Sequence, residues 1–304
     1  MTLTTHAPAD VSLQWGRRYL MVRPRHFRID YQINPFMDLM RQPNAHAAMA
    51  QSRALADAIE AAGGTVETVA QRPDSPDMVY AMNLGLAVNG PDGARVVMSH
   101  MRFPERRAET RSALRWFSDH GFRPSFLGRD GVGPFFESGD AVPFGGELVV
   151  GYWPRSDELA LKYLAAELDI RVRGVRIAHP AIYHLDLAFC PLDERVALVC
   201  PSAFDATSAR EMVDLVPEPI VLTGDEAMTF VANSIVVGRR VIAPACPPRV
   251  RRQIENAGFE VEIVCVDEFH KGGGSIRCLT NPIDIVIGRD LALVPGGEVV
   301  GPRA

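Results

Sequence analysis

Cysteine is scarce in this chain of 304 residues, and no two cysteines form a C-x-x-C pair. The five cysteines are an odd number, which argues against a disulfide framework or a zinc ribbon and predicts a reduced, cytoplasmic protein. No apolar run approaches the roughly 20 residues of a membrane-spanning helix, and residues 1–15 do not resemble a secretory signal. The net charge of −5 argues against a broad nucleic-acid surface. We therefore expect neither a membrane nor a nucleic acid as partner.

Segments rich in proline, glycine or serine that could link two domains are also missing. Instead, a helix followed by a strand recurs five times. In the first unit, Leu55 and Ile59 share one face of a helix over residues 47–62, Gly63 and Gly64 end it, and a strand is expected at 65–70. The other helix and strand pairs are expected at 106–122 and 124–127, 157–168 and 169–177, 206–216 and 218–223, and 248–259 and 260–266. We interpret this as a repeat, although many α/β proteins alternate helix and strand without one.

Polar motifs follow the strands of these units, where functional residues concentrate in α/β folds. Four are distinct: PDMVYAMN (76–83), FFESGD (135–140), YHLDLAF (183–189) and GGGSIRCLTN (272–281). The fourth unit is followed by a weaker motif, TGDEAMTFVANS (223–234).

Cys278 follows three glycines and precedes the sequence LTNP, a setting that predicts a loop. Glycine lets the backbone approach a ligand closely. Cys200 and Cys265 lie among apolar residues, as is typical of cysteines that are buried for packing. Cys278 is therefore the candidate nucleophile, and a non-catalytic loop cysteine is the alternative.

His184 and Asp186 are expected on one side of a strand, with Tyr183, Leu185 and Leu187 on the other. Histidine is the natural proton shuttle near neutral pH, and the carboxylate could bind a cation in the same pocket. A core histidine satisfied by hydrogen bonds is the alternative. No third ligand is spaced to complete a zinc site with this histidine, so no metal is expected.

Glu137 and Asp140 lie in a turn that follows two aromatic residues. A carboxylate at the end of a buried strand could orient a histidine or bind a cationic substrate. The alternative, above all for Asp140, is a surface turn stabilised by an Asx-type hydrogen bond.

Two arginines and two asparagines complete the candidates. Arg102 and Arg155 each follow an apolar, strand-like stretch, and either could bind a substrate carboxylate through its planar fork, although most arginines are simply solvated. Asn34 and Asn83 could offer amide hydrogen bonds at strand ends.

Cysteine, histidine and an acid, each at the end of a separate unit, resemble the guanidine-modifying superfamily with the pentein fold. The resemblance extends from Asn34 to Asn281 and implies a five-bladed α/β propeller around a central pocket, with residues 1–304 as one domain and residues 1–14 as a flexible or peripheral segment. It also implies roles: Cys278 resembles the nucleophile, His184 the general acid and base, and Glu137 the acid that orients the histidine and contacts the guanidinium.

Other positions resemble the substrate-binding residues of this superfamily. Asp186 resembles the second carboxylate that holds the guanidinium in deiminases, and Arg102 and Arg155 resemble the arginines that hold the amino-acid head group. Asp186 departs from the basic residue typical of dimethylargininases, and Asn83 departs from the aspartate typical of deiminases and dimethylargininases. Asn83 and Asn34 resemble arginine dihydrolases.

The expected function is therefore hydrolysis of guanidinium C–N bonds in arginine or a close derivative, by double hydrolysis to ornithine, ammonia and carbon dioxide. A dimethylargininase is the alternative, followed by an arginine deiminase, an amidinotransferase or a non-catalytic pentein that binds a small molecule. No cofactor is expected, because the glycines before Cys278 do not introduce the helix of a phosphate-binding loop. The expected partner is a small-molecule substrate, and a homo-oligomer is compatible with the sequence.

Overall fold

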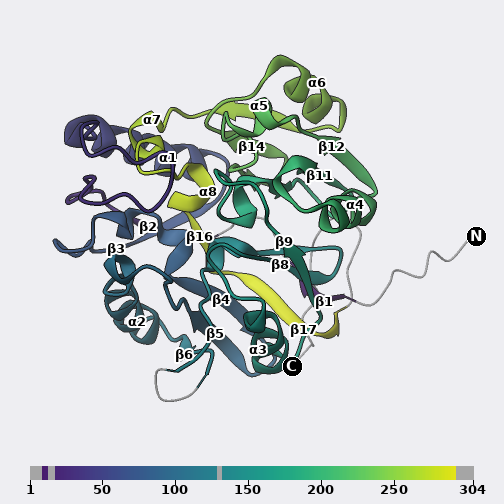
Figure 1. The fold of residues 1–304 in the computed structure, drawn as a ribbon, viewed down its shortest axis with the longest axis horizontal. Helices are drawn as coiled ribbons and strands as arrows, with labels where there is room; N and C mark the ends of the chain where they lie inside the picture. The colour runs from purple at the N-terminus through teal and green to yellow at the C-terminus, as the bar shows by residue number, and fades with distance from the viewer. Residues whose placement is uncertain (1–8, 13–17, 129–131, 292–304) are drawn as a thin grey trace, which may run out of the picture.

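The computed structural model describes residues 9–12, 18–128 and 132–291. Their strands form five sheets, one of five strands and four of three. Figure 1 shows the sheets inward of five peripheral helices, α1 (Ala45–Ala61), α2 (Glu109–Asp119), α3 (Leu159–Leu168), α4 (Ala206–Leu215) and α6 (Pro248–Asn256). This is a propeller-like α/β arrangement, and the five predicted helix and strand pairs are confirmed.

All five units share one topology. Two strands pair antiparallel, and a helix then leads to a third strand that pairs parallel with the second. The units that follow this order along the chain are β4 (Gly85–Gly90), β5 (Gly93–Met98) and β6 (Arg123–Ser125); β7 (Ala141–Phe144), β8 (Glu147–Tyr152) and β9 (Val172–Arg176); β10 (Phe189–Pro191), β11 (Val196–Val199) and β12 (Glu218–Val221); and β13 (Ile235–Val237), β14 (Arg240–Ala243) and β15 (Glu260–Ile263).

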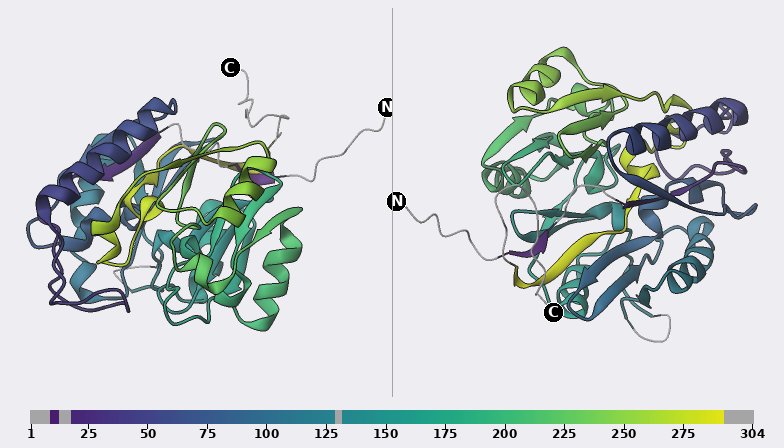
Figure 2. Two further views of the ribbon diagram at one scale, coloured as in Figure 1. Left: turned by 90° about the horizontal axis from the view of Figure 1, so that it is seen from above. Right: turned by 180° about the vertical axis from the view of Figure 1, so that it is seen from behind.

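The strands that follow β15 complete the first unit and extend the sheet of the second. In the first unit, β2 (Arg18–Val22) and β3 (Thr65–Val69) are parallel, and the antiparallel partner of β2 is β16 (Asn281–Pro282). Next, β17 (Ile285–Leu291) adds to β4, as Figure 2 shows from behind. On its other side β17 pairs with β1 (Ala9–Ser12), so this part of the expected flexible or peripheral segment is an edge strand.

The first helix illustrates how the sequence specifies each unit. The Asn44 side chain accepts a hydrogen bond from the Ala47 amide and caps the N-terminus of α1, and Gly63 follows its end at a φ of 94°. Leu55 and Ile59 are fully buried on its inner face. Replacing either with alanine would cost about 2–5 kcal/mol of stability, since a cavity would remain.

Short turns lie between the units, and six of the nine candidate residues lie in them or immediately before them. They are the 3₁₀ turns Pro76–Val79, Ala81–Leu84, Ser138–Asp140 and Leu185–Leu187, and the short helices α5 (Gly224–Ala227), α7 (Asp267–His270) and α8 (Ile276–Leu279). Among the described residues, no helix is long and apolar enough to cross a membrane.

Three local predictions were wrong. The strand expected around His184 is a 3₁₀ turn at Leu185–Leu187, because the Leu185 amide donates to Asp140 rather than to a neighbouring strand. Cys278 lies in the one-turn helix α8 rather than in a loop, so the glycines before it do precede a helix, although one of only four residues. Cys265 is exposed rather than buried for packing.

Candidate active site

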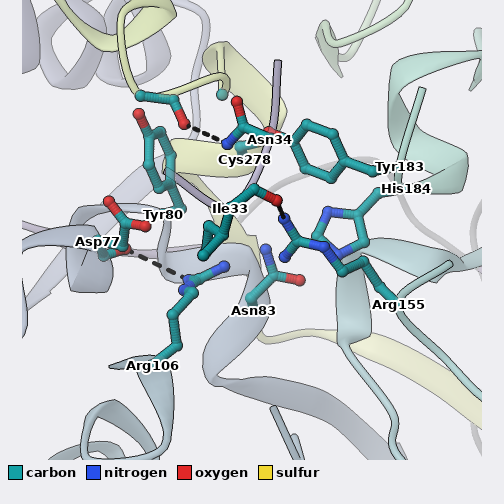
Figure 3. A pocket seen from close by; sticks show the side chains of 12 residues that line it. Ile33, Asn34, Asp77, Tyr80, Asn83, Arg106, Arg155, Tyr183, His184 and Cys278 are labelled. Carbon is teal, nitrogen blue, oxygen red and sulfur yellow. Dashed lines mark hydrogen bonds between the residues drawn. The ribbon is translucent and has the colours of Figure 1, made fainter. Parts of the chain in front are cut away.

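One pocket receives side chains from the connections between the units (Figure 3). It is lined by Ile33, Asn34, Asp77, Tyr80, Asn83, Arg106, Arg155, Tyr183, His184, Gly272, Gly274 and Cys278. The cavity has a volume of about 10 Å³, which is on the order of one water molecule. A ligand the size of an amino acid therefore enters only when residues that line the pocket move.

Cys278 is buried beside the carboxylate of Asp186. Its Sγ lies 3.6 Å from Asp186 Oδ2 and 3.2 Å from Asn233 Nδ2. Burial raises the pKa of the Cys278 thiol above its ordinary value, and the negative charge of Asp186 raises it further. The free protein therefore holds a neutral thiol, and a positive charge in the pocket would favour the thiolate.

His184 and Glu137 form a buried pair, with 2.8 Å between His184 Nε2 and Glu137 Oε2. The same oxygen accepts from Arg155 Nη1 at 3.1 Å. Burial alone would raise the pKa of Glu137, but Arg155, His184 and Arg106 together lower it below its ordinary value. An ionised carboxylate can only accept, so Nε2 carries the proton of the imidazole.

The other ring nitrogen of His184 is therefore the one available for chemistry. His184 Nδ1 is buried and has no hydrogen-bond partner within the described part of the chain. Figure 3 shows the imidazole facing the pocket. Such a nitrogen can take a proton and return it, while Glu137 stabilises the imidazolium.

Asn83, His184 and Asp186 meet over Gly139. A Cβ on this glycine would lie 2.9 Å from Asn83 Oδ1, 3.2 Å from His184 Cγ and 3.3 Å from Asp186 Oδ2. Asn83 Oδ1 accepts the Gly139 amide at 2.9 Å, so the orientation of the Asn83 amide is set by a main-chain donor. The Nδ2 group of Asn83 is consequently the donor on the pocket side.

The two predicted arginines differ in position. Arg155 lines the pocket, and its Nη2 donates to the Ile33 carbonyl at 3.1 Å. Arg102 is not among the lining residues, because its guanidinium pairs with Asp157 and lies 4.7 Å from the centre of the Phe135 ring. The expectation that Arg102 contacts the substrate head group is therefore not supported by its side chain.

Asp140 is also outside the pocket lining. Its Oδ1 accepts the Leu185 amide at 3.0 Å and its Oδ2 accepts the Ser156 hydroxyl at 2.7 Å. Burial raises the pKa of Asp140 to about 7. Asp140 thus holds the turn that carries His184, rather than a ligand.

Asn34 closes one wall of the pocket. Its Nδ2 donates to the Gly272 carbonyl at 3.0 Å, next to the glycines before Cys278. The Tyr183 hydroxyl donates to the Gly273 carbonyl at 2.6 Å. Both side chains therefore fix the backbone that precedes the thiol.

Sequence reasoning missed several residues at this site: Asp77, Tyr80, Arg106, Tyr183 and Asn233. All but Arg106 lie within the polar motifs that follow the predicted strands. Arg106 lies in the segment that contains Arg102, and the 3₁₀ turn Pro104–Arg106 places it rather than Arg102 at the pocket. No cluster of three or more His, Cys, Asp or Glu side chains that could hold a metal occurs among the residues the structure describes.

Comparison with known proteins identifies the family. A family model described as "N,N dimethylarginine dimethylhydrolase, eukaryotic" matches residues 23–285. The chain belongs to this dimethylarginine dimethylhydrolase family. This confirms the expected relationship to guanidine-modifying enzymes.

Relatives with two different activities resemble this family member equally. The N(G),N(G)-dimethylarginine dimethylaminohydrolase of Mycobacterium tuberculosis is 33% identical over 264 residues, which is 87% of this chain and 85% of that protein. The bifunctional arginine dihydrolase/ornithine cyclodeaminase ArgZ of Synechocystis sp. is 33% identical over 268 residues, which is 86% of this chain and 37% of that protein. Overall identity therefore does not separate the two activities.

Solved structures confirm the α/β fold of this family member. The N-terminal domain of ArgZ, an arginine dihydrolase from cyanobacteria, bound to product, matches with a TM-score of 0.81 and 32% identity over 90% of this chain and 97% of that one. A dimethylarginine dimethylaminohydrolase adduct with 4-chloro-2-hydroxymethylpyridine matches with a TM-score of 0.71 and 20% identity over 88% of this chain and 99% of that one, which supports the fold alone.

Proposed function

We propose that this protein is a cysteine-dependent hydrolase that converts arginine to ornithine, two molecules of ammonia and carbon dioxide. The orientation of Asn83 carries this proposal. We further propose that the chain acts as a single domain in the cytoplasm and needs no cofactor.

Asn83 distinguishes hydrolysis of a guanidinium from hydrolysis of a ureido group. A guanidinium has only donors and needs acceptors around it, whereas the ureido group of citrulline also has a carbonyl that needs a donor. Asp186 supplies the acceptor beside Cys278, and Asn83 Nδ2 supplies the donor, because Asn83 Oδ1 is held by the Gly139 amide. The pocket therefore suits both the substrate and the first product, and this supports a second hydrolysis.

The first half of the proposed reaction forms a bond between Cys278 and the substrate. The bound cation favours loss of the thiol proton to His184 Nδ1, and the thiolate attacks the guanidinium carbon. The imidazolium, stabilised by Glu137, then protonates the departing amine, and the C–N bond breaks to release ammonia. An amidino group remains on the sulfur.

The second half regenerates the thiol. His184 takes a proton from a water molecule that attacks the amidino carbon, the C–S bond breaks, and the imidazolium returns its proton to the departing thiolate. The product is citrulline. A second passage on the ureido group releases the second ammonia, and the resulting carbamate loses carbon dioxide to leave ornithine.

The pocket lining also contains side chains that suit an α-amino acid head group. Arg155 and Arg106 both line the pocket and could hold a carboxylate. Asp77 Oδ1 is buried there without a hydrogen-bond partner among the described residues, and such an oxygen suits an ammonium group. Arginine carries both groups at one end and the guanidinium at the other.

Structures of relatives support these roles. The N-terminal domain of ArgZ has been solved as a cysteine-to-serine mutant bound to substrate and as an asparagine-to-serine variant covalently bound to a reaction intermediate. A cysteine-to-alanine mutant of AgrE, the bifunctional enzyme of Nostoc sp., binds L-arginine. We assign the corresponding chemistry here to Cys278 and Asn83 on the geometry above.

A dimethylargininase, which releases dimethylamine and citrulline, is the second candidate. It is favoured by the family match and by the Mycobacterium tuberculosis relative. Arginine deiminase and amidinotransferase activities, or binding without catalysis, are the further alternatives. The polar side chain of Asp186 beside the sulfur and that of Asn83 in the pocket lining argue against two methyl groups on the substrate.

Product analysis tests the proposal. The protein is incubated separately with arginine, monomethylarginine and asymmetric dimethylarginine, and ornithine, citrulline, ammonia and dimethylamine are assayed. We expect ornithine and ammonia from arginine. Dimethylamine from dimethylarginine, without ornithine from arginine, would instead establish the second candidate, and citrulline as the sole end product would reject the double hydrolysis.

A further inference from the structure

Asn233 lies at the reacting sulfur and has no role in the mechanism above. It belongs to the weaker motif between β12 and β13, so each of the five connections between units supplies a residue next to the pocket. The Asn233 side chain is fully buried. Its Nδ2 lies 3.2 Å from Cys278 Sγ.

Two main-chain partners set which end of the Asn233 amide faces the sulfur. The Cys278 amide can only donate, and it lies 3.1 Å from Asn233 Oδ1. The Asp186 carbonyl can only accept, and it lies 3.0 Å from Asn233 Nδ2. These two partners therefore determine which end of the Asn233 amide is oxygen and which is nitrogen. One Nδ2 hydrogen remains for the sulfur.

The sulfur needs such a donor. The Asp186 carboxylate, 3.6 Å and 3.9 Å from Sγ through its two oxygens, disfavours a negative charge on it. Asn233 and the Ser275 backbone act in the opposite direction and lower the pKa of Cys278. Asn233 is thus the amide side chain that favours the thiolate against a neighbouring carboxylate.

We propose that Asn233 is a further catalytic residue that donates a hydrogen bond to the Cys278 thiolate. The inference rests on the proposed role of Cys278 as nucleophile. The same hydrogen bond acts twice in each cycle, when the thiolate forms before attack and when it departs as the C–S bond breaks. Asn233 also fixes the position of Cys278 relative to Asp186, because it binds the Cys278 amide and the Asp186 carbonyl.

The test measures the reactivity of the thiol without substrate. Wild type, Asn233→Ala and Asn233→Asp are alkylated with iodoacetamide between pH 7 and 10, and modification of Cys278 is followed by peptide mass spectrometry. Hydrogen bonds to charged groups are the stronger class, so we expect Asn233→Ala to react about 10- to 100-fold more slowly at every pH below the thiol pKa. The kcat for arginine should fall by a similar factor.

The alanine and aspartate variants together separate a catalytic role from a structural one. The aspartate variant keeps an acceptor for the Cys278 amide but replaces the donor with a second carboxylate near the sulfur. A donor to the thiolate predicts that Asn233→Asp reacts still more slowly than Asn233→Ala. If Asn233 only holds the backbone, Asn233→Ala will instead react at the wild-type rate or faster, because a loosened backbone exposes the buried thiol, and the inference fails.

Asn281 provides the matched control. It is also a fully buried asparagine, three positions from Cys278, and its Nδ2 donates to the Ala81 and Gly85 carbonyls rather than to sulfur. We expect Asn281→Ala to lower the melting temperature and leave the alkylation rate of Cys278 within about twofold of wild type, because a buried main-chain bond contributes to stability alone. An equal loss of alkylation in this control and in Asn233→Ala would overturn the inference. Failure of the proposed function would be visible separately, as wild type that is alkylated normally but releases nothing from arginine.

Discussion

The buried pair of His184 and Glu137 is the part of the mechanism that a single conservative change tests most cleanly. Glu137→Gln keeps the shape of the side chain and removes its charge. Its Oε2 lies 2.8 Å from His184 Nε2 and 3.1 Å from Arg155 Nη1, and the carboxylate is fully buried. The substitution therefore removes the charge that favours the imidazolium and leaves Arg155 without its partner.

The expected losses of stability and of rate can both be estimated. Removing one partner of a buried ion pair costs about 3–5 kcal/mol of stability, since the other charge remains buried. General acid catalysis by His184 contributes roughly 10²- to 10⁴-fold in rate, and Glu137 supports it by stabilising the imidazolium. We therefore expect kcat to fall about 10³-fold.

The assay is ammonia release from arginine between pH 5 and 10. Glu109→Gln is the control, because Glu109 is likewise a buried carboxylate paired with an arginine, Arg106, and has no contact with His184 among those the structure describes. The control should lose stability and keep most of the wild-type turnover. A folded Glu137→Gln variant with turnover within threefold of wild type would refute the assigned role of Glu137.

Three further outcomes are expected. Cys278→Ser should lose at least about 10³-fold in turnover with an unchanged melting temperature; substantial residual turnover would reject the nucleophile. Asn83→Asp should lose roughly 10²-fold in the second hydrolysis, as for loss of one preorganised donor, and accumulate citrulline from arginine; ornithine formed at the wild-type rate would contradict this. The folded state holds the Asp140 proton more tightly than the unfolded chain, because burial raises the pKa of Asp140 from 3.8 to about 7, so its contribution to stability falls as the pH rises from about 4 to 7. Asp140→Asn removes this fall, so the stability of the variant relative to wild type should rise between pH 5 and pH 8. A difference in urea midpoint between variant and wild type that is the same at both pH values would show that Asp140 does not titrate in this way.

The repeat was predictable because each unit carries its own local signals. Apolar spacing, as at Leu55 and Ile59, specifies a helix, and a glycine such as Gly63 ends it whatever lies elsewhere in the chain. The polar motifs at the pocket were predictable because each follows a strand of a unit, but the residues of these motifs that face the pocket were not, as Asp77, Tyr80 and Tyr183 show.

The remaining features depend on contacts between distant segments. The turn at Leu185–Leu187 is held by Asp140, which is 45 residues away. Arg102 is drawn from the pocket by Asp157, a partner that no local pattern identifies. The position of Asn233 against Cys278 likewise follows only from the meeting of two connections that are 45 residues apart.

The proposed function requires that one pocket hydrolyses both C–NH₂ bonds of the guanidinium group. Arginine labelled with ¹³C at the guanidino carbon tests this directly when the reaction is followed by NMR. Double hydrolysis predicts that the label passes through the ureido carbon of citrulline and ends in carbon dioxide and bicarbonate, with two ammonia molecules for each ornithine. Label that remains in citrulline, with one ammonia for each arginine consumed, would contradict it.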